Sequence, residues 1–380
     1  QCKNANVLKY FFVILQAVIC ISMKIGFDNE KYQKIQSEHI KERISQFDGK
    51  LYLELGGKLF DDHHASRVLP GFMPDSKLRM FQKISDSIEI VIVISATDIE
   101  KNKKRADLGI TYDEDVLRLR GEFQNRGFMV GSVVITHYNG QPAAIAFRQR
   151  LERDGIKTYC HYLIEGYPHN VALIASDEGF GKNDYVETER PLVIVTAPGP
   201  GSGKMAVCLS QLYNENKRGV RAGYAKFETF PVWNLPLKHP VNIAYEAATA
   251  DLNDVNMIDP FHLEAYNKIA INYNRDIEIF PVLNALFEGI YGSNPYKSPT
   301  DMGVNMVGFC ISDDEACCEA SKNEIVRRYY AATNKLACGA CNESEISKIQ
   351  MLFNQAKITT DFRRCTVAAK NFKKETGHTS

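Results

Sequence analysis

The residues best suited to chemistry form a glycine-rich turn at positions 198–204, with the sequence Pro-Gly-Pro-Gly-Ser-Gly-Lys. A buried-type strand precedes the turn and a helix-type segment follows it, which is the order that a phosphate-binding loop requires. Glycines let backbone N–H groups point inward around an anion, and the helix start adds unpaired N–H groups at its positive end. Lys204 would supply a mobile cation for the terminal phosphates. The ligand contacts predicted in the turn are Gly199, Gly201, Ser202, Gly203 and Lys204.

The turn departs from the usual phosphate-loop pattern at two positions. Pro198 stands where a glycine is expected, and Met205 stands where a hydroxyl residue is expected. That hydroxyl normally holds magnesium, so hydrolysis by the usual route would need a metal ion held elsewhere. The alternative is a tight strand-to-helix turn that is rich in glycine for steric reasons. Lys204 at the helix start has no steric purpose, and this favours phosphate binding.

Two acidic residues are candidates for handling metal or protons. The run 172–178 resembles a strand that ends in Asp177 and Glu178. Asp177 could hold magnesium and Glu178 could act as a base, and Lys204 would complete a catalytic set for phosphoryl transfer. The alternative is a simple Asp-Glu-Gly turn, and these acids precede the glycine-rich turn, which reverses the usual chain order.

Two further cations, Lys58 and Arg67, follow the strand expected at 51–55 and would add charge for a phosphate. The residues 61–64 between them, Asp-Asp-His-His, are of metal-binding types. Adjacent side chains rarely converge on one ion, so a polar loop is favoured there. Cys338 and Cys341 form a single C-x-x-C without a matching second pair, which is a weak zinc signal.

A proline-rich segment at 229–240 holds the only tryptophan, together with Lys238 and His239. Ordered loops of this length often cover ligand sites, and these two side chains could reach a ligand. An extended crossover between domains explains the segment equally well.

The elements that must position these residues alternate between strand and helix. Helices are expected at 29–47, 113–126, 142–155 and after residue 204, and strands at 51–55, 89–95, 130–136, near 157–164, at 171–175 and at 191–196. This alternation predicts an α/β fold, a doubly wound and mostly parallel sheet. Ligands of such sheets lie beyond the carboxyl ends of the strands, where the glycine-rich turn stands.

The chain changes character after residue 240. Helices are expected at 241–252, 261–271, 282–290, 313–335, 343–356 and 361–374. The predicted organisation is an extension foreign to the fold at 1–22, an α/β domain at 23–240, a mainly helical domain at 241–358, and the start of an incomplete C-terminal domain at 359–380.

Composition narrows the class of protein. Lys plus Arg and Asp plus Glu both number 46, so no net charge draws the chain to nucleic acid or to an anionic membrane. The apolar run at 7–21 is too short for a confident membrane span. Ten cysteines at irregular spacing indicate reduced thiols and a cytoplasmic protein.

We expect the protein to form a homo-oligomer and to bind a small phosphorylated molecule. ATP or another nucleotide is the first candidate for this ligand, and magnesium is the expected metal.

Several runs resemble one bacterial family, the domain-of-unknown-function 1846 family. They begin with Met-Lys-Ile-Gly-Phe-Asp at 23–28 and include 56–62, 65–72, 196–211, 225–231 and 254–262. The resemblance covers roughly residues 23–375, and runs this long and specific identify the chain as a member. It implies a three-part architecture without an established reaction, and relatives that continue past residue 377. Some members carry an ATP-dependent peptidase label, but no protease constellation is visible in this sequence.

Three functions stay open at this point. The first is a nucleotide-binding phosphotransferase or phosphohydrolase. The second is a non-catalytic module that binds a phosphorylated metabolite, which the missing hydroxyl at Met205 favours. The third is a structural protein in which the glycine-rich turn is only a turn.

Overall fold

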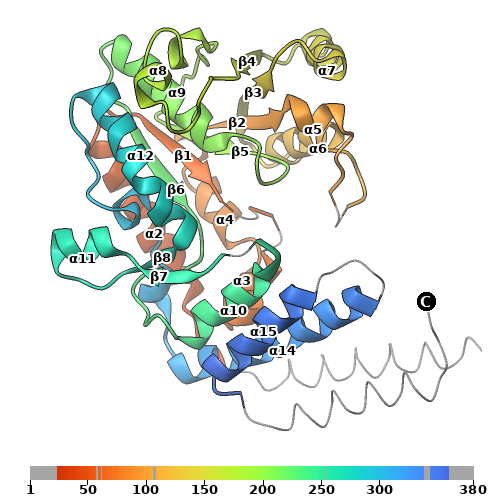
Figure 1. Cartoon of the computed structure of the whole chain (residues 1–380), viewed down its shortest axis with the longest axis vertical. Helices are drawn as coiled ribbons and strands as arrows, with labels where there is room; N and C mark the ends of the chain where they lie inside the picture. The colour runs from red at the N-terminus through yellow and green to blue at the C-terminus, as the bar shows by residue number, and fades with distance from the viewer. Residues whose placement is uncertain are drawn as a thin grey trace, which may run out of the picture.

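A central sheet of six parallel strands organises the protein, and the strand order is β4-β3-β2-β5-β1-β6 (Figure 1). The computed structural model describes residues 24–56, 59–60, 62–105, 108–252, 254–337 and 343–358. The strands are β1 (Leu51–Leu55), β2 (Ile88–Ser95), β3 (Met129–Tyr138), β4 (Thr158–Tyr162), β5 (Leu192–Thr196) and β6 (Gly223–Phe227). The α/β class and the parallel sheet predicted from the sequence are therefore confirmed.

Alternating side chains of the strands fill two cores, one on each face of the sheet. On one face Leu51, Leu53 and Ile90 pack against helices α4 (Ser76–Gln82), α6 (Tyr112–Gln124) and α7 (Pro142–Arg153). On the other face Tyr52 and Val193 pack against α9 (Lys204–Lys217) and α12 (Asn274–Tyr291). Strands covered on both sides read as continuous apolar runs, which is why β2 was visible in the sequence.

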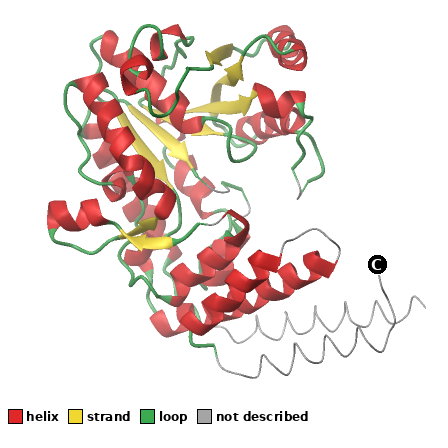
Figure 2. Ribbon diagram, in the orientation of Figure 1, coloured by secondary structure: helices red, strands yellow, loops and turns green. Residues whose placement is uncertain are grey.

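The remaining helices lie mostly beyond the carboxyl ends of the strands. They are α3 (His63–Val68), α5 (Ala96–Glu100), α10 (Pro240–Ala248), α11 (Pro260–Tyr266), α13 (Pro299–Met302), α14 (Asp314–Ala337) and α15 (Glu343–Gln355). Figure 2 shows α10, α14 and α15 stacked as a helical layer below the sheet. A third core joins this layer to α3 and to Phe27 and Tyr32.

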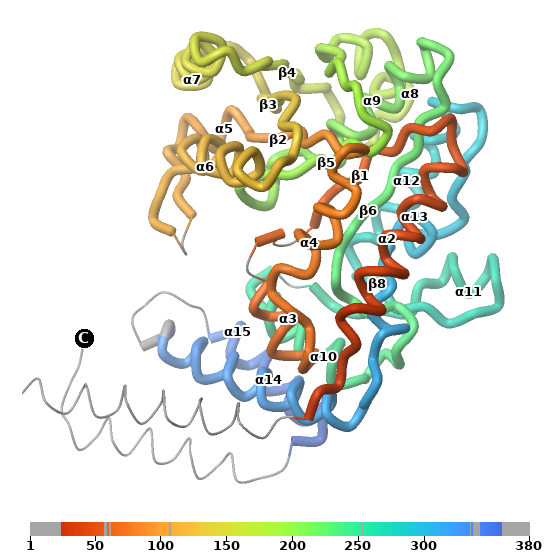
Figure 3. Tube along the Cα trace, turned by 180° about the vertical axis from the view of Figure 1, so that it is seen from behind, coloured from red at the N-terminus to blue at the C-terminus, as the bar shows by residue number. Residues whose placement is uncertain are grey.

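Helix α2 (Asn29–Ser45) links the sheet to the helical layer, and Figure 3 shows it running from one to the other. Tyr32, near its start, packs in the helical core, whereas Ile40 packs in a core of the sheet. Helix α12 follows residue 240 yet packs on the sheet. The hydrophobic cores are thus not divided at residue 240, and the predicted domain boundaries stay a prediction.

One predicted strand is wrong. The segment expected as a strand at 171–175 is the helix α8 (Val171–Ile174). The side chain of Asn170 accepts a hydrogen bond from the backbone N–H of Leu173 and so caps this helix. A short apolar run does not distinguish a buried strand from a buried helical turn by its periodicity, and the cap decides between them.

Three strands were not predicted. They are β6, at the edge of the sheet, and the antiparallel pair β7 (Asn256–Ile258) and β8 (Ile271–Tyr273). The expected helix at 361–374 and the proposed extension at 1–22 lie outside the described residues. Within the described part of the chain, no helix is both long enough and apolar enough to cross a membrane.

Candidate functional site

The glycine-rich turn connects β5 to α9 at the carboxyl edge of the sheet. Gly201 and Gly203 adopt φ angles of 75° and 87°, in the left-handed region that side chains other than glycine disfavour. Gly203 is the N-cap of α9 and provides no side chain to cap it. The N–H groups of Gly201, Gly203, Lys204 and Met205 donate no hydrogen bond to any residue that the structure describes. Donors are therefore left over at the positive end of α9.

Contacts from neighbouring elements hold the turn in place. Thr136 in β3 donates a hydrogen bond from Oγ1 to the carbonyl oxygen of Ser202 over 2.6 Å. A Cβ at Gly199 would lie 2.3 Å from Tyr112 Oη, so this position has no room for a side chain. Ser202 is 1% exposed, and its Oγ has no hydrogen-bond partner among the described residues. The turn thus contains a buried hydroxyl whose hydrogen-bonding capacity is unused.

A second polar group lies near the turn at the ends of β2 and β3. His137 has a φ of 51°, and the pairing of β3 with β4 shifts register between Ile135 and Tyr138. The ring Nδ1 of His137 lies 3.0 Å from Ser95 Oγ. The sequence marks both residues as strand ends, where ligands of such sheets bind, but it gave neither of them a specific role.

Lys204 is the first residue of α9, and its side chain forms no hydrogen bond or ion pair with any described residue. Asp177, in contrast, accepts a hydrogen bond from Tyr213 Oη over 2.7 Å and pairs with Lys217 at the far end of α9. From Lys204 to Lys217 the helix rises about 20 Å. The structure therefore does not bring Asp177, the predicted magnesium ligand, to the turn.

Glu178 lies beside Asp177 and pairs with Lys182. The strand that was expected to carry both acids to the carboxyl edge is the helix α8. The catalytic roles predicted for Asp177 and Glu178 assumed that strand, which the structure does not contain.

Of the two additional cations predicted to contact a phosphate, only Arg67 lies among the described residues. Lys58 lies outside the described residues. Arg67 lies in α3 and donates a hydrogen bond from Nε to Glu324 Oε2 over 2.8 Å. It lines a cavity of ≈ 420 Å³ beyond the carboxyl edge, which we call the Arg67 cavity. The cavity is lined by Gly56, Asp62, His63, His64, Arg67, Lys77, Glu228, Thr229, Phe230, Tyr245, Ala248, Thr249 and Arg328.

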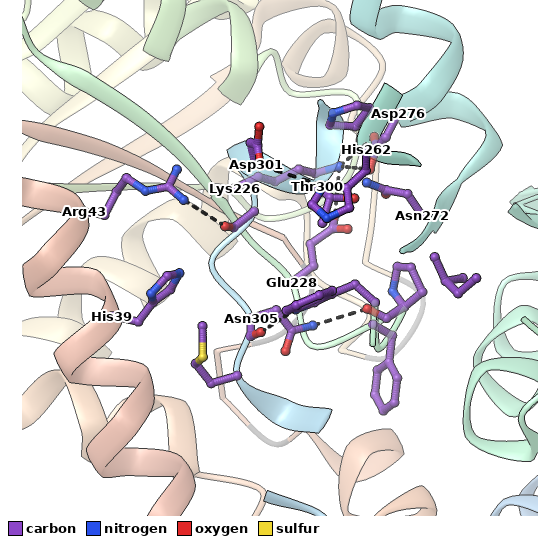
Figure 4. A pocket seen from close by; sticks show the side chains of 17 residues that line it. His39, Arg43, Lys226, Glu228, His262, Asn272, Asp276, Thr300, Asp301 and Asn305 are labelled. Carbon is purple, nitrogen blue, oxygen red and sulfur yellow. Dashed lines mark hydrogen bonds and ion pairs between the residues drawn. The ribbon is translucent and has the colours of Figure 1, made fainter. Parts of the chain in front are cut away.

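A second cavity, the Lys226 pocket, has a volume of ≈ 210 Å³ and lies beyond the end of β6 (Figure 4). In Figure 4, His39 and Arg43 reach in from α2, opposite Lys226 and Glu228. Its lining residues with polar or aromatic side chains are His39, Arg43, Lys226, Glu228, Phe230, Trp233, His262, Asn272, Asp276, Thr300, Asp301 and Asn305. The sequence signal for this pocket was the pair of charged residues at the end of an apolar segment, with Lys226 in β6 and Glu228 just after it, and no prediction was drawn from this pair.

Lys226 and the acids around it form a part-buried charge network. Its Nζ lies 2.8 Å and 2.7 Å from the two carboxylate oxygens of Asp276, and 3.4 Å from Glu228 Oε1. Burial alone would lower the pKa of Lys226, but the charges of Asp276 and Glu228 raise it above its ordinary value. Lys226 is therefore a fixed cation rather than a base.

Glu228 is the group of this network best suited to proton transfer. Burial raises the pKa of its carboxyl, and Lys226 offsets the effect only in part. The side chain belongs to the walls of both cavities. A Cβ at Gly56 would lie 2.4 Å from Glu228 Cγ, so the glycine after β1 provides the space for this side chain. A carboxyl whose pKa is shifted toward neutrality inside a pocket is a candidate acid or base.

The glycine-rich turn and Glu228 lie along the same edge. Strand β1 lies between β5 and β6, and Leu55 pairs with Phe227 just before Glu228. Neighbouring strands are about 4.8 Å apart, so the ends of β5 and β6 are separated by about 10 Å. No residue of the turn lines either cavity. A single nucleotide-sized ligand could nevertheless contact both.

His239, Asp314 and Cys318 are the one group of possible metal ligands found among the described residues. His239 Nε2 lies 3.0 Å from Asp314 Oδ1 and 3.5 Å from Cys318 Sγ. However, His239 Nδ1 accepts the N–H of Val241 and caps α10, so a neutral ring carries its proton on Nε2. That proton occupies the position that a metal ion would need. The C-x-x-C candidate at Cys338 and Cys341 lies outside the described residues.

Fold and site together define an α/β protein with a glycine-rich turn and two polar cavities along the carboxyl edge of a parallel sheet. The chain belongs to the family described as domain of unknown function DUF1846, N-terminal, which matches residues 25–357. It is similar to a UPF0371 protein of Streptococcus pyogenes serotype M5 (strain Manfredo), 59% identical over 353 residues. It resembles equally a UPF0371 protein of Streptococcus thermophilus (strain ATCC BAA-491 / LMD-9), 59% identical over 354 residues. Each match covers 93% of this chain and 72% of the relative. The predicted family is confirmed, and its function is unknown.

Proposed function

We propose that this protein binds a phosphorylated small molecule, with ATP or another nucleotide as the first candidate, at the turn 198–204. The observation that carries the proposal is that the backbone N–H groups of Gly201, Gly203, Lys204 and Met205, and the side chain of Lys204, have no hydrogen-bond partner in the part of the chain that the structure describes. A helix start with free donors and a nearby cation is a general anion site. Its position at the carboxyl edge of a parallel sheet is where ligands of such folds bind.

In this arrangement the phosphate oxygens accept hydrogen bonds from the turn, and Lys204 neutralises part of their charge. The unused hydroxyl of Ser202 is a further donor if the ligand reaches it. The rest of the ligand would extend over Gly56 toward Glu228, about 10 Å away. Glu228 could then exchange a proton with the part of the ligand that lies there.

Phosphotransferase or phosphohydrolase activity has less support than binding. Phosphoryl transfer depends on a metal ion and on a positioned base. Asp177 and Glu178 lie near the far end of α9, and Met205 has no oxygen for magnesium. The alternative, a non-catalytic module for a phosphorylated metabolite, fits these facts better. A cytoplasmic location and a homo-oligomeric state stay predictions.

Calorimetric titration of the full chain with ATP, ADP and glucose 6-phosphate, with and without magnesium, tests the proposal. Lys204→Ala should weaken binding roughly 10- to 100-fold, because a hydrogen bond to a charged group contributes about 1.5–3 kcal/mol. Lys217→Ala, at the other end of the same helix, is the matched control and should bind as the wild type does. Absence of binding by all three compounds, or equal binding by Lys204→Ala, contradicts the proposal. Product formed from ATP would favour the enzyme over the binding module.

A further inference from the structure

The Arg67 cavity has more positive charge around it than its own carboxylates neutralise. The side chain of Glu324, in α14, is 1% exposed and is shared by three arginines. It accepts hydrogen bonds from Arg67 Nε at 2.8 Å, Arg327 Nε at 2.5 Å and Arg328 Nε at 2.8 Å. Among the described residues, none of these arginines pairs with another carboxylate. One buried negative charge therefore faces three guanidinium groups.

The other titratable groups at the cavity do not remove this excess. Lys77 and Asp62 pair with each other at 2.8 Å and cancel. Burial lowers the pKa of His64, so its ring is neutral near pH 7 and adds no charge. Glu228 is already engaged with Lys226, and burial raises the pKa of its carboxyl. Among the residues that the structure describes, Glu324 therefore leaves two positive charges of its three arginines uncompensated, and the cavity is lined by two of these arginines, Arg67 and Arg328.

The rest of the wall suits a flat or apolar group. Phe230 and Tyr245 stack with their ring centroids 4.8 Å apart and their planes 18° apart. The ring of His64 packs edge-on against both, and its buried Nε2 has no hydrogen-bond partner among the described residues. The cavity volume of ≈ 420 Å³ falls in the range of small-molecule sites, which is about 300–1,000 Å³.

We propose that the Arg67 cavity binds a phosphate monoester, whose dianionic phosphate lies between Arg67 and Arg328 and whose organic part lies against Phe230 and Tyr245. A dianion matches the two uncompensated charges, whereas a carboxylate leaves one of them unmatched. This site is distinct from the turn 198–204. Its residues come from Gly56, from α3 and its N-cap, from α4, α10 and α14, and from the segment after β6, and none comes from the turn. It shares Gly56 and Glu228 with the path proposed for the nucleotide, but Arg67 and Arg328, which carry this proposal, take no part in the proposed function.

Titration of the full chain with phenyl phosphate, followed by calorimetry, tests the site, and benzoate serves as the monoanionic counterpart. Arg67→Met and Arg328→Met should each weaken phenyl phosphate binding at least tenfold. Each variant leaves Glu324 with two arginines, so the buried carboxylate is still compensated. Arg79→Met, which removes an exposed arginine paired with Asp75, is the control and should bind as the wild type does.

Several results would overturn the proposal. These are no detectable binding of phenyl phosphate, equal binding by both arginine variants, or benzoate binding as tightly as phenyl phosphate. Loss of binding in Lys204→Ala alone would place the probe at the glycine-rich turn; the cavity proposal would then fail while the proposed function stood. Arg328→Lys keeps the charge and loses the planar fork, so an intermediate affinity is expected. This variant also tests the site if Arg328→Met does not fold.

Discussion

A buried histidine in β4 should make the fold sensitive to mild acid. His161 is 3% exposed, and its Nε2 lies 3.1 Å from the carbonyl oxygen of Asp184, to which it donates. The ring Nδ1 is buried without a partner among the described residues. Burial lowers the pKa of His161 to about 4, against about 6.5 in an unfolded chain. The unfolded chain therefore takes up this proton first as the pH falls.

The size of the effect follows from these two pKa values. A group whose pKa is depressed in the folded state contributes its full stabilisation above the unfolded pKa of about 6.5 and loses it as the pH falls toward about 4. The complete loss is about 3 kcal/mol, at about 1.36 kcal/mol for each pKa unit. At pH 5 the loss from this one residue is about 2 kcal/mol.

Urea denaturation of the wild type and of His161→Gln, at pH 8 and at pH 5, measures this loss. Between the two pH values the wild type should lose about 2 kcal/mol more of its unfolding free energy than the variant does. Contributions from the rest of the chain are common to both proteins and cancel in the difference. His169→Gln, which removes an exposed histidine, should show the loss of the wild type. If wild type and His161→Gln lose the same amount, the reasoning is wrong.

Two further predictions concern the carboxyl edge of the sheet. Lys226→Met should lower the unfolding free energy by about 2 kcal/mol in urea denaturation, because the part-buried carboxylates of Asp276 and Glu228 then keep only the more distant Arg275, at 3.8 Å and 3.6 Å. A change below 1 kcal/mol would mean that the network is solvated. Gly203→Ala should destabilise the chain more than Gly219→Ala does, since both have positive φ but only a Cβ at Gly203 meets a neighbour, at 3.2 Å. The left-handed conformation alone costs roughly 1–2 kcal/mol, and equal losses in thermal denaturation would contradict the steric argument.

The parts of the fold visible in the sequence were those set by local patterns. The apolar run of β2 predicted a buried strand, and the proline at the start of α7 predicted where that helix begins. The turn 198–204 was found because its glycines, its lysine and the following helix are contiguous. The run at 171–175 was wrongly predicted as a strand because four apolar residues fit either a strand or a helical turn. The N-cap residue Asn170, which favours the helix, was not taken into account.

The residues of the cavities could not be found in the same way. Arg67 and Glu324 lie 257 positions apart, so no local pattern connects them. Lys226 and Asp276 lie 50 positions apart and meet because α12 packs back onto the sheet. Such pairs are created by topology, and only the three-dimensional arrangement reveals which charges remain uncompensated.

The closeness of Gly56 and Glu228 couples two positions that are far apart in the chain. A Cβ at position 56 would stand 2.4 Å from Glu228 Cγ, so a longer residue at 56 requires the Glu228 side chain to move or a shorter residue to replace it. The two positions should therefore change together across the family. Glu228 lines both cavities, so a shorter residue there would enlarge each of them on the side that faces Gly56.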